Sequence, residues 1–151
     1  MCLIPKKDET DKLKKSRKTA FTGYKIYRVI ENEIWSGFMY DVVVEIDSLQ
    51  PKKNIIHKSN RHRKTVDWEE KHCAEIEQGI HVFLSEENAE KIRKRDVKTR
   101  ILVPVQCFKR NLVAAGVWSD NTRMKQAVFT QVTIQSDDLI NAVNKLLKRK
   151  K

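Results

Sequence analysis

The chain has 151 residues, a length typical of one domain, and 40% of them are hydrophobic, which supplies a modest core. Its net charge of +11 indicates an anionic partner such as nucleic acid, nucleotide phosphates or an anionic surface, although lysine-rich tails that only keep a protein soluble give the same balance. No apolar run approaches the ~18 residues needed to span a membrane. No apolar signal segment follows the first lysines. Three cysteines without paired spacing, Cys2, Cys73 and Cys107, predict free thiols in a reducing cytoplasm.

Residues 1–20 are predicted to be a flexible basic arm. They hold seven Lys or Arg and three acids, with few apolar residues and no usable period. Such an arm either binds phosphate weakly or keeps the protein soluble. Residues 21–151 are then expected to form a single domain.

Alternating or continuous apolar runs predict strands at 23–30, 37–47, 81–84, 99–108, 112–118 and 127–134, with a turn or loop at 31–36. Pro104 lacks an N–H, so strand 99–108 is expected at a sheet edge or a bulge, where its apolar side chains favour homo-oligomerisation. Helices are predicted from Asp67 to Gly79, from an N-cap at Ser85 to about Arg95, and from Ser136 onward. The fold expected is α+β: a mostly antiparallel sheet of five or six strands with about three helices packed on one side.

Arg28 is the first candidate for ligand binding. It shares a strand face with Tyr24 and Ile26, and a guanidinium on a buried row needs an anion or a carboxylate because it cannot lose its proton. The alternative is an arginine at the strand edge that reaches solvent. Further along, small residues at 114–116 allow close approach of either another backbone or a flat ligand.

The segment 51–64 contains no acidic residue. Its cations form a second candidate, a phosphate-gripping loop for nucleic acid, made of Lys52, Lys53, Lys58, Arg61, Arg63 and Lys64. His57 and His62 lie among them, but no carboxylate or cysteine stands at ligand spacing, so no metal site is expected. In this alternative, residues 1–20 and the basic C-terminal tail bind the same polyanion.

No enzyme motif is recognised. The four glycines, at 23, 37, 79 and 116, form neither a GxGxxG sequence nor a phosphate-binding loop, and GxSxG, HExxH and CxxC are absent. His72 and Cys73 are neighbours on a predicted helix, where they point about 100° apart and form no nucleophile pair. We therefore expect neither catalysis nor a cofactor.

Two families share short motifs with this chain. GYKIYR followed by GIHVFLSEENAEKI resembles ADP-ribosyltransferase-like folds, in which an arginine on the first strand contacts the dinucleotide. That family's activity rests on a late glutamate. The corresponding strand here, AVFTQVTI, offers Gln131 and Thr133, so the resemblance implies a domain without the catalytic residue.

Residues 22–134 are also similar to the phage anti-Thoeris sponge family, through YKIYR, GIHVFLSEENA, LVAAG and the loop before AVFTQVTI. This resemblance implies a compact α+β oligomer in the host cytoplasm that sequesters a phosphorylated nucleotide signal of the cyclic ADP-ribose or cyclic oligonucleotide type, without cleaving it. It assigns phosphate contacts to Arg28 and Arg123, base stacking to Phe83, and backbone contacts to Ala115 and Gly116. Nucleotide capture and nucleic-acid binding are thus the two hypotheses.

Overall fold

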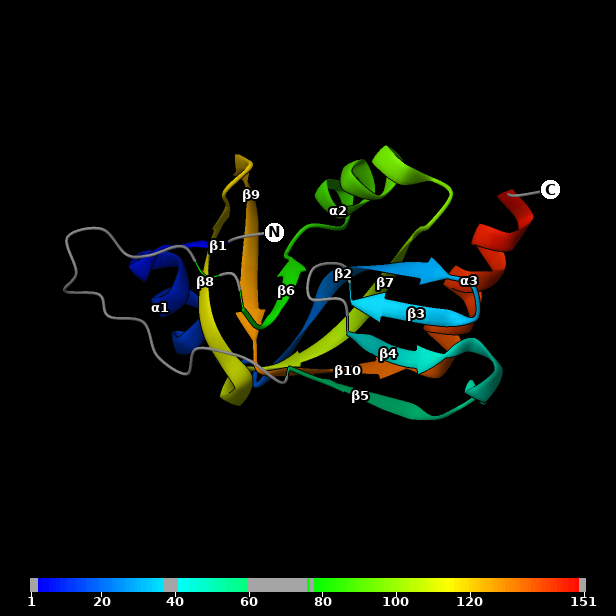
Figure 1. The fold of residues 1–151 in the computed structure, drawn as a ribbon. Coiled ribbons are helices and arrows are strands. Elements are labelled where there is room, and N and C mark those ends of the chain that lie inside the picture. The colour runs from blue at the N-terminus through cyan, green and yellow to red at the C-terminus, as the bar shows by residue number, and fades with distance from the viewer. Residues whose placement is uncertain (1–2, 37–40, 60–75, 77, 150–151) are drawn as a thin grey trace.

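The computed structural model describes residues 3–36, 41–59, 76 and 78–149. These contain three α-helices, α1 (Lys7–Lys15), α2 (Glu86–Arg93) and α3 (Ser136–Arg149). They also contain ten strands of one antiparallel sheet (Figure 1): β1 (Leu3–Pro5), β2 (Ala20–Ile30), β3 (Glu33–Ser36), β4 (Val42–Glu45), β5 (Asn54–Lys58), β6 (Ile80–Phe83), β7 (Arg100–Phe108), β8 (Leu112–Trp118), β9 (Asn121–Phe129) and β10 (Gln131–Gln135). Short 3-10 turns are η1 (Ile46–Ser48), η2 (Lys94–Asp96) and η3 (Lys109–Asn111). The α+β class is confirmed, but the expectation of five or six strands is too low.

The sheet is organised around the β2–β7 ladder, which runs without a shift from Ala20 opposite Phe108 to Arg28 opposite Arg100. The strand order is β1-β8-β9-β6-β2-β7-β10-β5, and β3 joins β2 to β4. The expected edge position of strand 99–108 is therefore wrong, because β7 lies between β2 and β10 with Pro104 opposite Tyr24. An apolar edge at β7 no longer supports homo-oligomerisation, which stays a prediction.

Two further boundaries differ from the expectation. Residues 31–36 are not a loop: Glu31 has a φ of 54° in a tight turn, and β3 then pairs back on β2. The run 127–134 is not one strand, because it breaks at Thr130. β9 lies beside β8 and β6, whereas β10 lies beside β7 and β5. The break carries the chain from one half of the sheet to the other (Figure 1).

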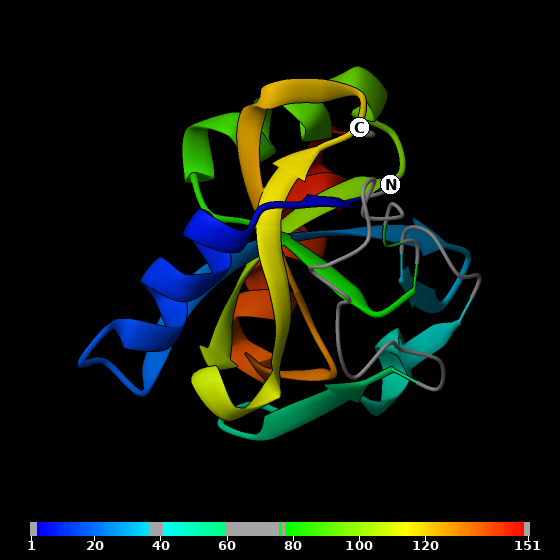
Figure 2. The ribbon, with the colours of Figure 1, turned by 90° about the vertical axis from the view of Figure 1, so that its left-hand side faces the viewer.

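The predicted flexible arm is ordered from Leu3 onward. β1 pairs with β8, and α1 follows along the same strand (Figure 2). Leu3 is fully buried, and the hydroxyl of Thr10 donates to the carbonyl of Ala115 at 3.0 Å and accepts from its N–H at 3.0 Å. The segment is thus ordered by a few specific contacts despite its high charge. Composition alone does not reveal such contacts.

Several predictions fall on residues outside the described ranges. They include most of the helix from Asp67, the cysteines Cys2 and Cys73, and the cations Arg61, Arg63 and Lys64. Ile76 is described, and it forms an antiparallel bridge with Leu3 where the sequence predicts helix. Cys107 is buried as a free thiol.

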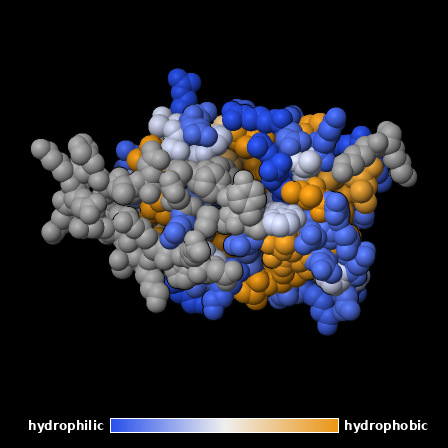
Figure 3. Space-filling view, in the orientation of Figure 1, coloured by the Kyte–Doolittle hydropathy of each residue, from blue (hydrophilic) through white to orange (hydrophobic). Residues whose placement is uncertain are grey.

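The core has two main parts. The larger joins β2 and β7 to α3, whose Leu139, Val143 and Leu146 are buried as the apolar stripe predicts. The smaller lies under α2, where Ala89 and Ile92 pack against side chains of β2, β6, β8 and β9. The helices occupy separate places around the sheet and do not share one side (Figure 1). Apolar side chains also reach the surface over β4 and β5, where Val42 and Ile56 are exposed (Figure 3).

Gly116 sets how closely β1 approaches β8. A Cβ there would lie 2.0 Å from the carbonyl oxygen of Ile4, so Gly116→Ala forces the two strands apart. We expect a loss of about 2–4 kcal/mol in the free energy of unfolding, measured by urea denaturation. In a chain that lacks residues 1–6 the same substitution is expected to cost less than about 0.5 kcal/mol. Equal costs in both backgrounds would contradict this account.

A candidate ligand-binding groove between two helices

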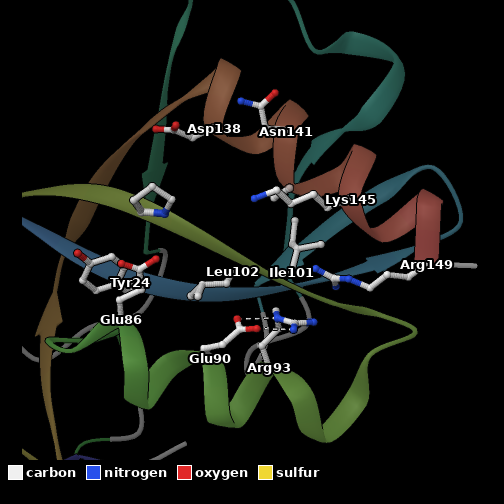
Figure 4. Close-up of a pocket in the computed structure, with 12 residues that line it drawn as sticks. Tyr24, Glu86, Glu90, Arg93, Ile101, Leu102, Asp138, Asn141, Lys145 and Arg149 are labelled. Carbon is white, nitrogen blue, oxygen red and sulfur yellow. Dashed lines mark hydrogen bonds and ion pairs between the residues drawn. The ribbon is translucent and has the colours of Figure 1, made fainter.

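A groove with a volume of about 570 Å³ lies between α2 and α3 (Figure 4). Its floor comes from the central ladder, with Tyr24 of β2 and Ile101, Leu102 and Pro104 of β7. Its walls come from the helices and hold Glu86, Glu90, Arg93, Asp138, Asn141, Ala142, Lys145 and Arg149. Four elements that are distant in the sequence therefore supply one concave surface, apolar at the bottom and charged along both sides.

Local sequence explains how each wall faces the groove. Ser85 caps α2 as predicted, because its side chain accepts the N–H of Asn88 at 3.3 Å. Glu86, Glu90 and Arg93 then follow at spacings of four and three, which places them on one helix face. On α3 the groove side chains recur at the same helical spacing, while the apolar stripe on the adjacent face anchors the helix to the sheet.

The charges in the groove are separated. Glu86 lies beside Tyr24 and Asp138 lies at the same end on α3, whereas Lys145, Arg149 and the ion-paired Arg93 and Glu90 lie toward the other end (Figure 4). Because charges of one sign at the end of a low-dielectric cleft add their fields, the basic end attracts an anionic group. The groove thus suits a ligand with an anion at one end and hydrogen-bond donors at the other.

Arg93 is the most constrained side chain of the basic end. It is 7% exposed, and its Nε donates to Glu90 Oε2 at 2.7 Å while Nη2 bonds the second oxygen of the same carboxylate. The hydrogen bonds that Arg93 donates to Glu90 lower the pKa of the Glu90 carboxyl and raise the pKa of the Arg93 guanidinium. Nη1 is buried with no hydrogen-bond partner in the described part of the chain. A buried N–H without an acceptor costs free energy, which an anionic ligand oxygen would offset.

Arg28 lies beyond the groove on β2. It is half-buried, stands opposite Arg100, and its Nε lacks a hydrogen-bond partner among the residues described. Arg100 donates instead to the carbonyl of Ile92 at 2.8 Å, which ties β7 to the end of α2. Arg28 therefore belongs to the same end of α2 as Arg93, although it does not line the groove.

The other residues assigned by resemblance do not gather around Arg28. Phe83 is 1% exposed and packs edge-on against Trp118 in the core under α2, so neither ring face is open to a base. Ala115 and Gly116 are buried under the N-terminal segment, which takes the close approach that their small size allows. Arg123 is exposed on β9, where its backbone N–H donates to Asn121. The small residues at 114–116 were predicted to admit either another backbone or a flat ligand, and in the structure a backbone lies against them.

Part of the predicted phosphate-gripping loop is structural. The backbone N–H of Lys53 donates to the Ser136 hydroxyl at 2.9 Å, and that of Lys52 donates to Asp137 at 3.3 Å. These bonds fasten the turn before β5 to the start of α3. Lys58 is exposed on β5. The described half of the loop is thus a turn followed by the strand β5, which pairs with β10, and the cationic side chains of Lys52, Lys53 and Lys58 lie in solvent.

A buried polar cluster of Lys25, Tyr27 and His57 was not predicted from the sequence. Lys25 is 2% exposed and lies 5.7 Å from the Tyr27 ring centroid, and the Tyr27 hydroxyl is hydrogen-bonded to His57 Nδ1 at 2.8 Å. Burial lowers the pKa of Lys25 to about 8. Burial and then Lys25 lower the pKa of His57 to about 3, and burial lowers that of His81 to about 4. The only early sign was that Lys25 and Tyr27 share the strand face opposite Arg28.

The remaining reactive groups among the described residues give no further site. Burial raises the pKa of Cys107 to about 12, which keeps it a thiol and a weak nucleophile. Within the described ranges, no three His, Cys, Asp or Glu side chains gather to hold a metal ion. None of the described helices is long and apolar enough to cross a membrane.

Comparison of the chain with protein-family models, curated proteins and solved structures gave no match.

Replacing Lys25 with methionine is expected to stabilise the protein. The ammonium is charged below pH 8 in the folded state, and burial penalises this charged form. The folded-state pKa is below the ordinary 10.5, so the penalty is full below pH 8 and fades as pH rises toward 10.5. Lys25→Met should add roughly 2 kcal/mol to the free energy of unfolding at pH 7 and little near pH 10.5.

Thermal and urea unfolding across this pH range measure the effect of Lys25→Met. The control is Lys98→Met, because Lys98 is exposed and its change should alter stability by less than about 0.5 kcal/mol at any pH. A Lys25→Met protein that is destabilised at pH 7 would show that the ammonium has a favourable partner.

Proposed function

We propose that the groove between α2 and α3 captures a small phosphorylated nucleotide without turning it over. The observation that carries this proposal is the basic end of the groove, where the buried Nη1 of Arg93 lacks an acceptor beside Lys145 and Arg149. A phosphate there can accept hydrogen bonds from three cationic side chains, of which Arg93 is held in place by Glu90. Charge-assisted bonds of this kind are about twice as strong as neutral ones.

The rest of the groove suits the remainder of a nucleotide. Tyr24 and the apolar side chains of Leu102 and Pro104 form a surface on which a base or ribose packs. Glu86 and Asp138 at the far end accept hydrogen bonds from ribose hydroxyls or an exocyclic amine. A volume of about 570 Å³ falls within the roughly 300–1,000 Å³ of small-molecule sites.

The proposal keeps the ligand class implied by the sponge resemblance and changes the residues that bind it. Tyr24 replaces Phe83 as the aromatic surface, and Arg93, Lys145 and Arg149 replace Arg28 and Arg123 as phosphate ligands. Sequestration of an immune nucleotide signal in a host cytoplasm, with assembly into homo-oligomers, is part of the same proposal. The alternative from the other resemblance is an ADP-ribosyltransferase-like domain that lacks the catalytic glutamate.

Calorimetric titration with ADP-ribose and cyclic ADP-ribose tests the groove. Lys145→Gln should weaken binding about tenfold or more, because it removes a charge-assisted bond to phosphate. Lys148→Gln is the matched control, since it removes the same charge from the same helix at an exposed position that does not line the groove. It should change the dissociation constant less than about twofold.

Two observations would contradict the proposal. Equal weakening by Lys145→Gln and Lys148→Gln would mean that the helix attracts the probes only through its total charge. Consumption of ADP-ribose during incubation, followed by chromatography, would replace capture with catalysis. Native mass spectrometry of the protein purified from cells identifies a retained nucleotide and reports the assembly state.

A further inference from the structure

A second cationic surface lies toward the C-terminal end of α1, whereas the acids of that helix lie nearer its N-terminal end. It comprises the C-terminal half of α1, the turn after it, and η3, and we call it the α1–η3 patch: Lys12, Lys14, Lys15, Arg17, Lys18, Lys109 and Arg110. All are exposed except Lys109, which is half-buried. No acidic residue occurs in 12–19 or 108–112. These two segments therefore contribute seven positive charges and no negative charge to the patch.

The patch is a fixed surface because two distant segments are bonded together. The Nζ of Lys109 donates to the carbonyl of Ser16 at 2.9 Å, and its backbone N–H donates to the carbonyl of Thr19 at 2.9 Å. Arg110 lies 4.5 Å from the Phe108 ring centroid, which holds its guanidinium against an aromatic face. Between them is a hollow of about 490 Å³ lined by Lys14, Thr19, Lys109, Arg110 and Leu112.

The protein itself leaves these charges uncompensated. Of the acids on α1, Asp11 pairs with Lys7 at 3.3 Å and Glu9 pairs with Lys125 at 3.2 Å. Within the described part of the chain, no ion pair involves a cation of the α1–η3 patch. The helix dipole accounts only for the lysines in the last turn of α1, because Arg17, Lys18, Lys109 and Arg110 lie outside the helix.

We infer that the α1–η3 patch binds the phosphodiester backbone of nucleic acid. A cluster of unpaired cations, three of which line a shallow hollow, can contact several phosphates at once, and such binding gains free energy by releasing counterions. The groove between α2 and α3 differs in kind, since its three acids and three bases balance. The two sites therefore favour different ligands, a polyanion at the patch and a small dipolar anion in the groove.

Fluorescence anisotropy with a labelled DNA duplex, its single strand and the matching RNA tests the inference. The variant Lys14→Gln/Lys15→Gln/Lys18→Gln removes three charges from the patch. The matched control Lys91→Gln/Lys94→Gln/Lys98→Gln removes three exposed charges from α2, η2 and the turn that follows. We expect the patch variant to lose about tenfold or more in affinity and to flatten the log–log salt slope by about two.

The control should keep its salt slope and lose less than about threefold in affinity. Equal losses in both triple variants would overturn the inference, because affinity would then follow net charge and not the patch. So would the absence of binding to every nucleic-acid probe at low salt. Binding to anionic phosphatidylserine vesicles without binding to nucleic acid would assign the patch to a membrane surface instead. Titration of the patch variant with ADP-ribose reports separately on the groove.

Discussion

The β2–β7 ladder is the constraint on which the rest of the structure depends. Its strands carry different chemistry on their two faces. Tyr24, Ile26 and Arg28 face α2, whereas Lys25, Tyr27 and Val29 face the larger core and the buried histidines. The nine paired positions fix both faces at once. A slip of one residue would exchange them, placing Lys25 under α2 and the groove floor inside the core. The groove exists because this register holds.

The sequence predicted the elements whose signals are local. The alternation of 23–30, the N-cap at Ser85 and the apolar stripe of the last helix all correspond to observed elements. The elements it missed depend on distant partners. β1 has three residues, and its stability comes from Leu3 and from Gly116, more than a hundred residues away. Pro104 reads as an edge signal, yet a strand can keep a partner on each side when the missing N–H falls where no ladder bond is needed.

The candidate site was less predictable than the fold, for a related reason. Arg28 was chosen from the pattern of a single strand and Phe83 from a family resemblance, and the structure places them differently: the Phe83 ring is buried in the core, whereas Arg28 is half-buried. The groove is built from two helices about fifty residues apart. On each helix alone, the charged face reads as ordinary solvated surface. The signal becomes visible only when both faces are placed over Tyr24 and Pro104.

The net charge of +11 therefore does not by itself predict which surface binds an anion. Where acids and bases alternate along a helix, as on α2, they pair locally: Glu90 holds Arg93 and Glu87 holds Lys91. Where the chain segregates them, as on α1, the acids pair at one end and the cations are left at the other. Net charge sets only the long-range attraction of an anion, which salt screens. The spacing of the acids determines which cations are paired, as in the groove, and which are unpaired, as on the patch. The charge distribution of a ligand then determines which of the two surfaces it binds.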